Sequence, residues 1–431
     1  MKSDCEAVNK NKNEKTTKIN KAGAFFGINT SMLTMLLMAV VIGLGEKMGE
    51  RFLPVYILAI GGTTLAVGLL NAMDNFLSAA YSYIGGYISD WLGYKKALFI
   101  YTCIAMFGYA VIIAFPVWQA VLIGAVFFIS WTALSLPAIL SLISATVKKE
   151  KQTMGVSLHS LSRRIPMALG PVLGGVFITF YGIKTGARIS FAAAFILGIF
   201  ALWFIHRFIK EKSREKCRPP KLRDSFIKIS KELRILLLSD IFIRFAEQIP
   251  YAFVVVWVMQ NNGISAASFS MLTVVEMITA MLIYIPVAYL SEKTTSKLLI
   301  SITFGFFTIF PLILLFSTNM PLLIFAFVIR GLKEFGEPTR KALIVKLAPE
   351  GNKASIFGTY YLIRDVVVSI AALSSALLWN VSPSANFLTA ALFGTIGTTI
   401  FILFGKDENL THNETHNRTA VRRTVQGTGN I

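Results

Sequence analysis

The stretch GYISDWLGYKKAL, residues 86–98, places Asp90, Lys95 and Lys96 between two long apolar runs. Each run has about 20 residues, the length that an α-helix needs to cross roughly 30 Å of hydrocarbon. The three charged residues are therefore expected in water, at one surface of a membrane. A similar stretch, AYLSEKTTSKLLI at residues 288–300, brings Glu292 and Lys297 roughly 200 positions later, which indicates an internal repeat.

The repeat continues on both sides of these stretches at a constant offset of 201 positions. Five residues recur after 201 positions: Glu46, Phe52, Val55, Gly62 and Pro137 recur as Glu247, Phe253, Val256, Gly263 and Pro338. Two apolar halves built on one plan are typical of membrane transporters with internal repeats.

Composition excludes a soluble enzyme. Of the 431 residues, 55% are hydrophobic, and the mean hydropathy of +0.63 is typical of a protein with many membrane spans. The net charge of +19 does not indicate a nucleic-acid partner, because the basic residues gather in loops. Cys5, Cys103 and Cys217 lack paired spacing, so neither disulfides nor a metal site is expected, and no cofactor is indicated.

The apolar segments predict an all-α membrane protein with twelve transmembrane helices in two pseudo-symmetric six-helix bundles. The predicted spans are 30–59, 63–87, 96–115, 119–147, 154–180, 186–207, 235–260, 264–290, 297–317, 320–347, 354–379 and 385–405. The predicted domains are a tail at 1–28, a bundle at 29–207, a basic linker at 208–234, a second bundle at 235–405 and a tail at 406–431.

Lysine and arginine gather on one side of the predicted spans. They occur in the N-terminal tail, in residues 86–98, at 148–151, in the linker and near Lys297, whereas Lys184 and Arg188 alone occur on the other side. Basic residues near span ends mark the cytoplasmic face. We therefore expect a multi-pass protein of the plasma membrane with both termini in the cytoplasm.

Charged residues inside the apolar segments mark the candidate site. On insertion scales each such charge costs roughly 2.5–3.5 kcal/mol at mid-membrane, so these side chains are expected to be paired, hydrated or both. Two segments carry polar stripes at helical spacing: Asn71, Asp74, Asn75, Ser78 and Ser82, and Arg330, Lys333, Glu334, Glu337 and Lys341. The candidates for substrate binding or proton coupling are Glu46, Glu50, Asp74, Arg244, Glu247, Glu276, Arg330, Lys333, Glu334, Glu337, Arg364 and Asp365. The alternative is a permanent network of buried ion pairs that only holds helices together.

The 86–98 stretch resembles the signature between spans 2 and 3 of the major facilitator superfamily of secondary transporters. The matching residues are Gly86, Ile88, Asp90, Gly93, Lys95, Lys96 and Leu98, whereas Trp91 and Tyr94 stand where arginine is usual. The resemblance implies a conformational latch made of Gly86, Asp90, Gly93, Lys95 and Lys96, with Glu292 and Lys297 from the repeat.

A second resemblance lies in LGPVLGG, residues 169–175. Gly170, Pro171, Gly174 and Gly175 are similar to the core of a span-5 motif typical of antiporter subfamilies, although Pro166 stands where a glycine is expected. The same small residues are equally expected where two helices merely approach closely.

The family resemblance covers residues 29–405 and implies two bundles that rock around a central site. Spans 1, 4, 7 and 10 line that site in the family, which adds Trp131 to the candidates. The expected function is secondary active transport of a small polar or amphiphilic organic solute by a monomer, coupled to protons, with export favoured over import. The alternative is a non-transporting membrane receptor or assembly factor, which would gain nothing from charged stripes at mid-membrane.

Glu46 and Glu247 occupy equivalent places in the two halves. Desolvation disfavours an ionised carboxylate, whereas a nearby Lys47 or Arg244 favours it, and the balance can let an acid exchange protons near neutral pH. Two interpretations remain open, a pair of proton carriers or a pair of permanent ion pairs.

Both termini and the linker are predicted to be cytoplasmic. A reporter fused after Ile431 should give the cytoplasmic signal, and Asn413 in the tail should stay unglycosylated. External labelling of the tail would contradict the twelve-span count.

Asp90→Asn is expected to slow transport and to leave substrate affinity almost unchanged, because a latch acts on the conformational step. Uptake and binding measured side by side test this expectation. Complete loss of binding in a normally expressed variant would move Asp90 into the binding site.

Overall fold

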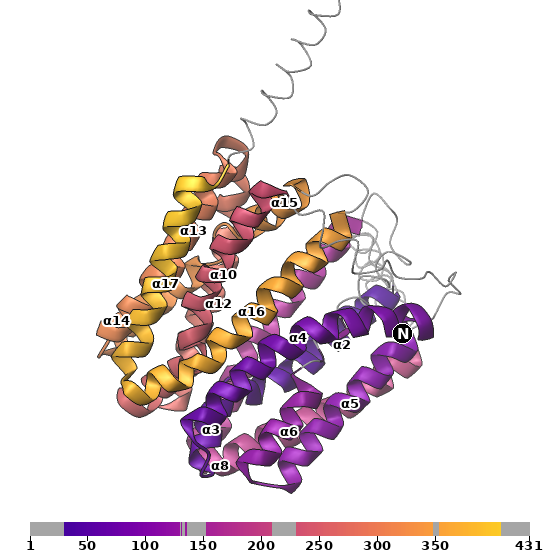
Figure 1. The fold of residues 1–431 in the computed structure, drawn as a ribbon. Helices are drawn as coiled ribbons and strands as arrows, with labels where there is room; N and C mark the ends of the chain where they lie inside the picture. Colours follow the sequence, from indigo (N-terminus) through magenta and orange to yellow (C-terminus); the bar gives the residue numbers. More distant parts are fainter. Residues whose placement is uncertain are drawn as a thin grey trace, which may run out of the picture. The chain divides into compact units, whose positions relative to one another are not determined.

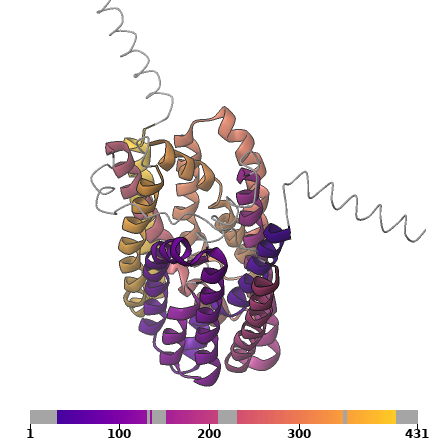
Figure 2. The ribbon, with the colours of Figure 1, turned by 90° about the vertical axis from the view of Figure 1, so that its right-hand side faces the viewer.

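The computed structural model describes residues 30–129, 131, 134–135, 152–208, 230–347 and 353–406. Within these ranges the regular structure consists of helices alone (Figures 1 and 2). The predicted tails, most of the linker and the basic residues at 148–151 lie outside the described residues.

The N-terminal half contains a series of long helices. They are α2 (Thr30–Glu50), α3 (Leu53–Ala59), α4 (Thr64–Leu92), α5 (Tyr94–Ala114), α6 (Trp118–Phe128) and α8 (Gln152–Phe208). The first predicted span is interrupted at Arg51 and Phe52, between α2 and α3. α8 holds two predicted spans, which separate at Gly182, where a φ of 75° is a left-handed conformation that glycine adopts without strain.

The C-terminal half repeats this series. Its helices are α10 (Lys231–Tyr251), α11 (Phe253–Val256), the π-helix η2 (Trp257–Asn261), α12 (Ala266–Lys293), α13 (Ser296–Phe316), α14 (Met320–Leu332), α15 (Glu337–Leu347), α16 (Lys353–Val381) and α17 (Pro383–Phe404). Ser265, Thr295 and Asn319 cap α12, α13 and α14 by accepting a backbone N–H from three residues on. All twelve predicted spans coincide with described helices, the fourth of them only in part, and the fold class is the predicted one.

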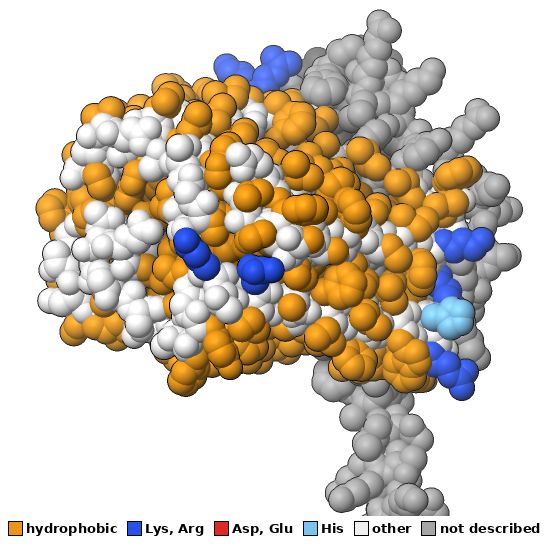
Figure 3. All heavy atoms as spheres, turned by 90° about the horizontal axis from the view of Figure 1, so that it is seen from below, with side chains coloured by type: hydrophobic (Ala, Val, Ile, Leu, Met, Phe, Trp, Pro, Cys, Tyr) orange, Lys and Arg blue, Asp and Glu red, His pale blue; other side chains and the backbone are white. Residues whose placement is uncertain are grey.

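Seven helical stretches in the described part of the chain are long and apolar enough to cross a membrane: Lys95–Ala114, Ser162–Phe208, Lys231–Asn261, Ala266–Ile283, Ser296–Phe316, Ile356–Val381 and Pro383–Phe404. The 47 residues of Ser162–Phe208 form two helices that separate at Gly182 and together contain about 70 Å of helix, enough for two crossings. The other predicted spans carry charges, are interrupted or are only partly described. Hydrophobic side chains cover most of the face that Figure 3 shows. Phe180 and Phe316 are among the exposed aromatic residues of the described chain. Apolar surface of this extent is expected to face lipid.

The 86–98 stretch is mostly helical, whereas its charged residues predict a turn. α4 continues through Asp90 to Leu92, α5 begins at Tyr94, and Gly93 with a φ of 85° forms the connection. The 29 residues of α4 extend for about 43 Å, which exceeds the hydrocarbon thickness. The helix can therefore project into water while its backbone hydrogen bonds remain satisfied.

The chain divides into two compact units. One comprises Met1–Tyr56 and Ala80–Pro219, and the other comprises Ile57–Ala79 and Pro220–Ile431. The first part of α4 groups with the second unit because it contacts α16. Gly68 lies against Ala376, and Thr64 Oγ1 lies 2.5 Å from Asn380 Oδ1.

In the first unit α2 packs along α8. A side chain at Gly170 would overlap Lys47, and one at Gly174 would overlap the backbone carbonyl of Met48. The LGPVLGG segment therefore lets the two backbones approach closely beside Glu46, which agrees with the packing interpretation.

In the second unit α10 packs against α13, α16 and α17. Leu236, Phe304 and Phe401 belong to its buried apolar core. Among the buried side chains of the same helices are charged groups that the core cannot solvate, so these groups must find partners in one another.

Candidate functional site

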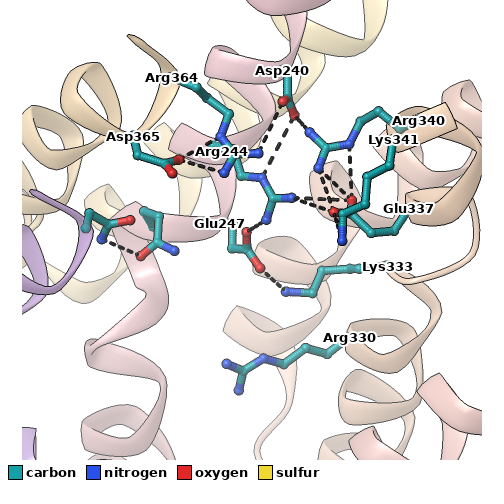
Figure 4. A network of polar contacts seen from close by, with 12 residues as sticks. Asp240, Arg244, Glu247, Arg330, Lys333, Glu337, Arg340, Lys341, Arg364 and Asp365 are labelled. Carbon is teal, nitrogen blue, oxygen red and sulfur yellow. Dashed lines mark hydrogen bonds and ion pairs between the residues drawn. The ribbon is translucent and has the colours of Figure 1, made fainter. Parts of the chain in front are cut away.

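Asp240 of α10 is 1% exposed and lies among three arginines (Figure 4). Its carboxylate pairs with Arg340 of α15, and Arg364 Nη1 of α16 lies 3.4 Å from Oδ2. Tyr360 donates its hydroxyl to Oδ2 at 3.1 Å, and Arg244 Nε lies 3.9 Å from Oδ1. One carboxylate cannot neutralise three guanidinium groups, so further acids are needed close by.

Glu337, in the first turn of α15, is the second acid of the network. Arg340 Nη2 donates to both of its carboxylate oxygens at 2.7 Å. Arg244 Nη2 lies 3.4 Å away, and Lys341, whose side chain is 52% exposed, lies at 3.5 Å. Glu337 therefore joins α15 to α10, and the position of Lys341 marks the exposed edge of the network.

Glu247 is the third acid and lies two turns after Asp240 on α10. Arg244 Nη1 donates to Glu247 Oε2 at 2.5 Å, and Lys333 Nζ donates to Oε1 at 2.9 Å. The Lys333 ammonium also lies over the rings of Phe307 and Phe310, at 4.9 and 5.7 Å from their centroids. Glu247 thus connects the arginines of the network to a lysine in aromatic surroundings.

Lys333 lies in a break between two helices, and Glu337 lies directly after that break. α14 ends at Leu332, α15 begins at Glu337, and Gly336 in the gap lies so close to the backbone of Leu299 that a side chain would not fit. Gly336 N–H donates to Thr303 Oγ1 at 2.5 Å. The carboxylate of Glu337 lies at the start of α15, where the helix dipole favours negative charge.

Charges balance within the buried network. Arg364 donates to Asp365 through Nε at 2.7 Å, which adds a fourth acid. The four acids Asp240, Glu247, Glu337 and Asp365 face the four bases Arg244, Lys333, Arg340 and Arg364. Each buried ion costs several kcal/mol in desolvation unless partners compensate it, and here every ion has at least one partner. Glu247 is ion-paired with Arg244, as the ion-pair interpretation expected, and also with Lys333.

A separate ion pair joins α12 to α14. Arg330 Nε lies 3.3 Å from Glu276 Oε1, and both side chains are buried. The Arg330 guanidinium also lies 5.5–5.8 Å from the ring centroids of Tyr251, Phe310 and Phe327. Arg330 and Lys333, one turn apart, thus share Phe310 as a neighbour.

The first unit contains a smaller cluster of charges on α2. Lys47 Nζ lies 3.2 Å from Glu46 Oε1 and also pairs with Glu50. One ammonium group is therefore shared between two carboxylates.

The polar stripe of α4 contacts α10 next to Glu247. Asn71 Nδ2 donates to the carbonyl of Gln248 at 2.9 Å, and Asn75 Nδ2 donates to Gln248 Oε1 at 3.2 Å. Ser78 donates to Asp74 Oδ1 at 3.4 Å. Asn71 and Asn75 of the predicted stripe thus bind the residue that follows Glu247.

The remaining predicted residues lie in different environments. Trp131 is 3% exposed and donates its indole N–H to Thr102 at 3.2 Å within the first unit. Glu334 follows Lys333 and bonds through its backbone N–H to Gly331. Lys95 donates to the carbonyl of His206 at 3.0 Å, Lys96 is exposed and Lys297 is half-buried. Gly86 and Asp90 lie in α4 and Glu292 in α12, and their side-chain surroundings lie outside what the structure describes.

Sequence reasoning missed Asp240 and Arg340. Asp240 lies four residues before Arg244 and seven before Glu247, which is the spacing of one helix face. Arg340 lies three residues after Glu337. Asp240 therefore lies one helical turn before a predicted site residue, and Arg340 lies one turn after another. Helical spacing alone could have added both residues to the predicted site.

Asp240→Asn is expected to destabilise the protein by about 3–5 kcal/mol, because it leaves buried arginines without their acid. Thermal unfolding of the protein in nanodiscs measures this effect. Glu232→Gln is the matched control, since Glu232 pairs at 3.4 Å with Lys406, whose side chain is 53% exposed, and should cost less than about 1 kcal/mol. Equal stability of the two variants would contradict a stabilising role for Asp240.

Comparison with known proteins agrees with this architecture. The model of the Major Facilitator Superfamily matches residues 22–243 and again residues 236–427, one match for each half. An uncharacterised MFS-type transporter of Methanocaldococcus jannaschii is 23% identical over 366 residues, which cover 82% of this chain and 89% of that protein.

Solved transporter structures share the fold at low identity. A nucleoside transporter NupG variant superposes with a TM-score of 0.75 at 12% identity, covering 88% of this chain and 100% of that chain. The peptide transporter POT, solved with sulfate, gives 0.71 at 14% identity, covering 88% and 94%. A D-xylose-proton symporter gives 0.65 at 13% identity, covering 86% and 97%. With the family model matched over both halves, this chain belongs to the Major Facilitator Superfamily of membrane transporters.

Proposed function

We propose that this protein is a secondary active transporter that moves a small polar or amphiphilic organic solute by alternating access and couples this movement to protons. Family membership supports the transporter class. The charge-balanced network around Asp240, Glu337 and Glu247 supports the finer statement, because it places ionisable groups with exchangeable partners inside a membrane protein.

Glu247 is the acid that we assign to the coupling proton. It contacts two cations, Arg244 and Lys333, and Arg244 has other acids within reach. Protonation of Glu247 would change the pairing of Lys333 and leave the remainder of the network compensated. A proton would then alter one contact between α10 and the segment that follows α14, which is the kind of local switch that can bias a conformational equilibrium.

Glu46 is the second candidate, because it occupies the equivalent place in the first half. It shares the ammonium group of Lys47 with Glu50. Arg163, Arg164 and Arg51 are further charges in this half, and each has contacts of its own.

The cellular setting follows from the sequence. We propose a location in the plasma membrane, both termini in the cytoplasm and a monomeric protein. Export is the direction favoured by the similarity of residues 169–175 to an antiporter motif. A non-transporting receptor on the same fold is the competing function, and a flux measurement separates the two.

Glu247→Gln is expected to abolish accumulation driven by a pH gradient and to preserve exchange of solute across the membrane, because exchange needs no net proton movement. Liposomes containing the full chain, with solutes first selected by their thermal stabilisation of the protein, provide the measurement. Glu46→Gln is measured in parallel, and Glu232→Gln serves as the surface control.

Two results would contradict the proposal at different levels. If both Gln variants accumulate solute like the unmodified protein, neither acid carries the proton, and Asp74, Glu276, Glu334, Glu337 and Asp365 become the candidates. If a stabilising solute never crosses the membrane in either direction, the receptor alternative is correct.

A further inference from the structure

Within the described part of the chain, Lys333 is the buried cation of the network whose compensation depends on one acid, whereas Lys341, which also contacts a single acid, is half exposed to water. Among the described residues, Glu247 is the carboxylate that contacts its ammonium group, at 2.9 Å. Arg244, by contrast, also contacts Glu337 and Asp240. Loss of the charge on Glu247 therefore leaves Arg244 compensated and Lys333 uncompensated.

The surroundings of Lys333 are aromatic on one side. Phe307 and Phe310 of α13 lie under its ammonium group, and Phe310 also lies beside Arg330. Aromatic faces stabilise a cation and present an apolar surface to a neighbouring organic group. The Lys333 ammonium group thus lies between one carboxylate and two aromatic rings.

Charged and titratable groups lie on the helix that carries Glu247 and on the helices around it. They are Asp240 and Arg244 on α10, Lys333, Glu334, Glu337, Arg340 and Lys341 on and before α15, Tyr360, Tyr361, Arg364 and Asp365 on α16, and Asp74 on α4. The four acids and four bases of the buried network sum to zero when Glu247 is ionised. They sum to one positive charge when Glu247 has taken up a proton.

We propose that the substrate is an organic monoanion with an apolar body, whose carboxylate or similar oxyanion replaces Glu247 as the partner of Lys333 once Glu247 is protonated. This inference rests on the proposed proton coupling. A monoanion restores the neutrality of the buried network, whereas a neutral solute leaves Lys333 uncompensated and a cation adds a second uncompensated charge. No covalent bond changes, and the proton resides on Glu247.

The substrate anion pairs with Lys333 only when Glu247 is protonated, so the anion and the proton are bound to the protein at the same time. A proton and an anion that bind together also cross together, so the inference predicts cotransport. This is the opposite of the exchange that the antiporter-like segment at 169–175 favours, and the two can be separated by measuring flux under a pH gradient.

Benzoate, benzamide and benzylamine test the inference, because they share a ring and differ in charge. Thermal stabilisation of the full chain in nanodiscs is measured for each over a pH series in which benzoate remains ionised. Benzoate alone should stabilise the protein, and more strongly as the pH falls. Glu247→Gln should bind benzoate more tightly at the higher pH values and lose most of the pH dependence.

Lys333→Gln should weaken benzoate binding by at least about tenfold, because a charge-assisted hydrogen bond is lost. Lys333→Arg keeps the charge and should keep measurable binding. The double variant with Glu247→Gln and Lys333→Gln leaves no unpaired ion, so it controls for misfolding, and it should bind benzoate no better than Lys333→Gln. Lys406→Gln, at a surface ion pair, should bind like the unmodified protein.

Three results would overturn the inference: no stabilisation by benzoate, equal stabilisation by benzylamine or benzamide, or unchanged benzoate binding in Lys333→Gln. These results are separate from the test of proton coupling. If Glu247→Gln uncouples transport and the benzoate results fail, the proposed function stands and the anionic substrate does not. If benzoate binding depends on Lys333 and no solute is transported, the site stands and the transport function does not.

Discussion

Ion pairing of the buried Asp240 constrains how α10, α15 and α16 pack in the second unit. A carboxylate that is removed from water needs cationic partners, and Asp240 obtains them from two other helices, α15 and α16, as well as from its own. The three arginines then require further acids, which Glu337, Glu247 and Asp365 provide. The positions of α10, α15 and α16 are thus tied together by charge compensation, and the interruption before α15 supplies the geometry that this compensation needs.

The acids of this network differ in how many neighbouring groups depend on their charge. Asp240 lies deepest and contacts three arginines and a tyrosine, so removal of its charge disturbs several helices at once. Glu247 contacts one arginine with other partners and one lysine. A change of its charge therefore has a local effect. Since Asn71 and Asn75 bind the next residue, Gln248, that effect arises beside the contact between α4 and α10.

The sequence predicted what depends on composition and periodicity, and it missed what depends on tertiary contacts. The twelve apolar segments, the internal repeat and the inward stripe on α4 follow from residue order alone. The helical continuation through Asp90 was not predicted, because charged residues were taken to end a helix at the membrane surface. Arg244 pairs with Glu337 from 93 positions away, and Glu247 pairs with Lys333 from 86 positions away. Such pairings arise from packing, and no local pattern specifies them.

The repeat itself indicates where the chemistry differs between the halves. Pro137 and Pro338 match in the sequences of predicted spans 4 and 10, yet Ile129 and Thr132 stand where Arg330 and Lys333 occur. For two halves to share one fold, their helix lengths and apolar faces must match. Their charged residues need not match. In span 7 Asp240 and Arg244 likewise replace Ala39 and Gly43 of span 1. Asp240, Arg244, Arg330 and Lys333 are therefore charges that the second half has and the repeat itself does not require.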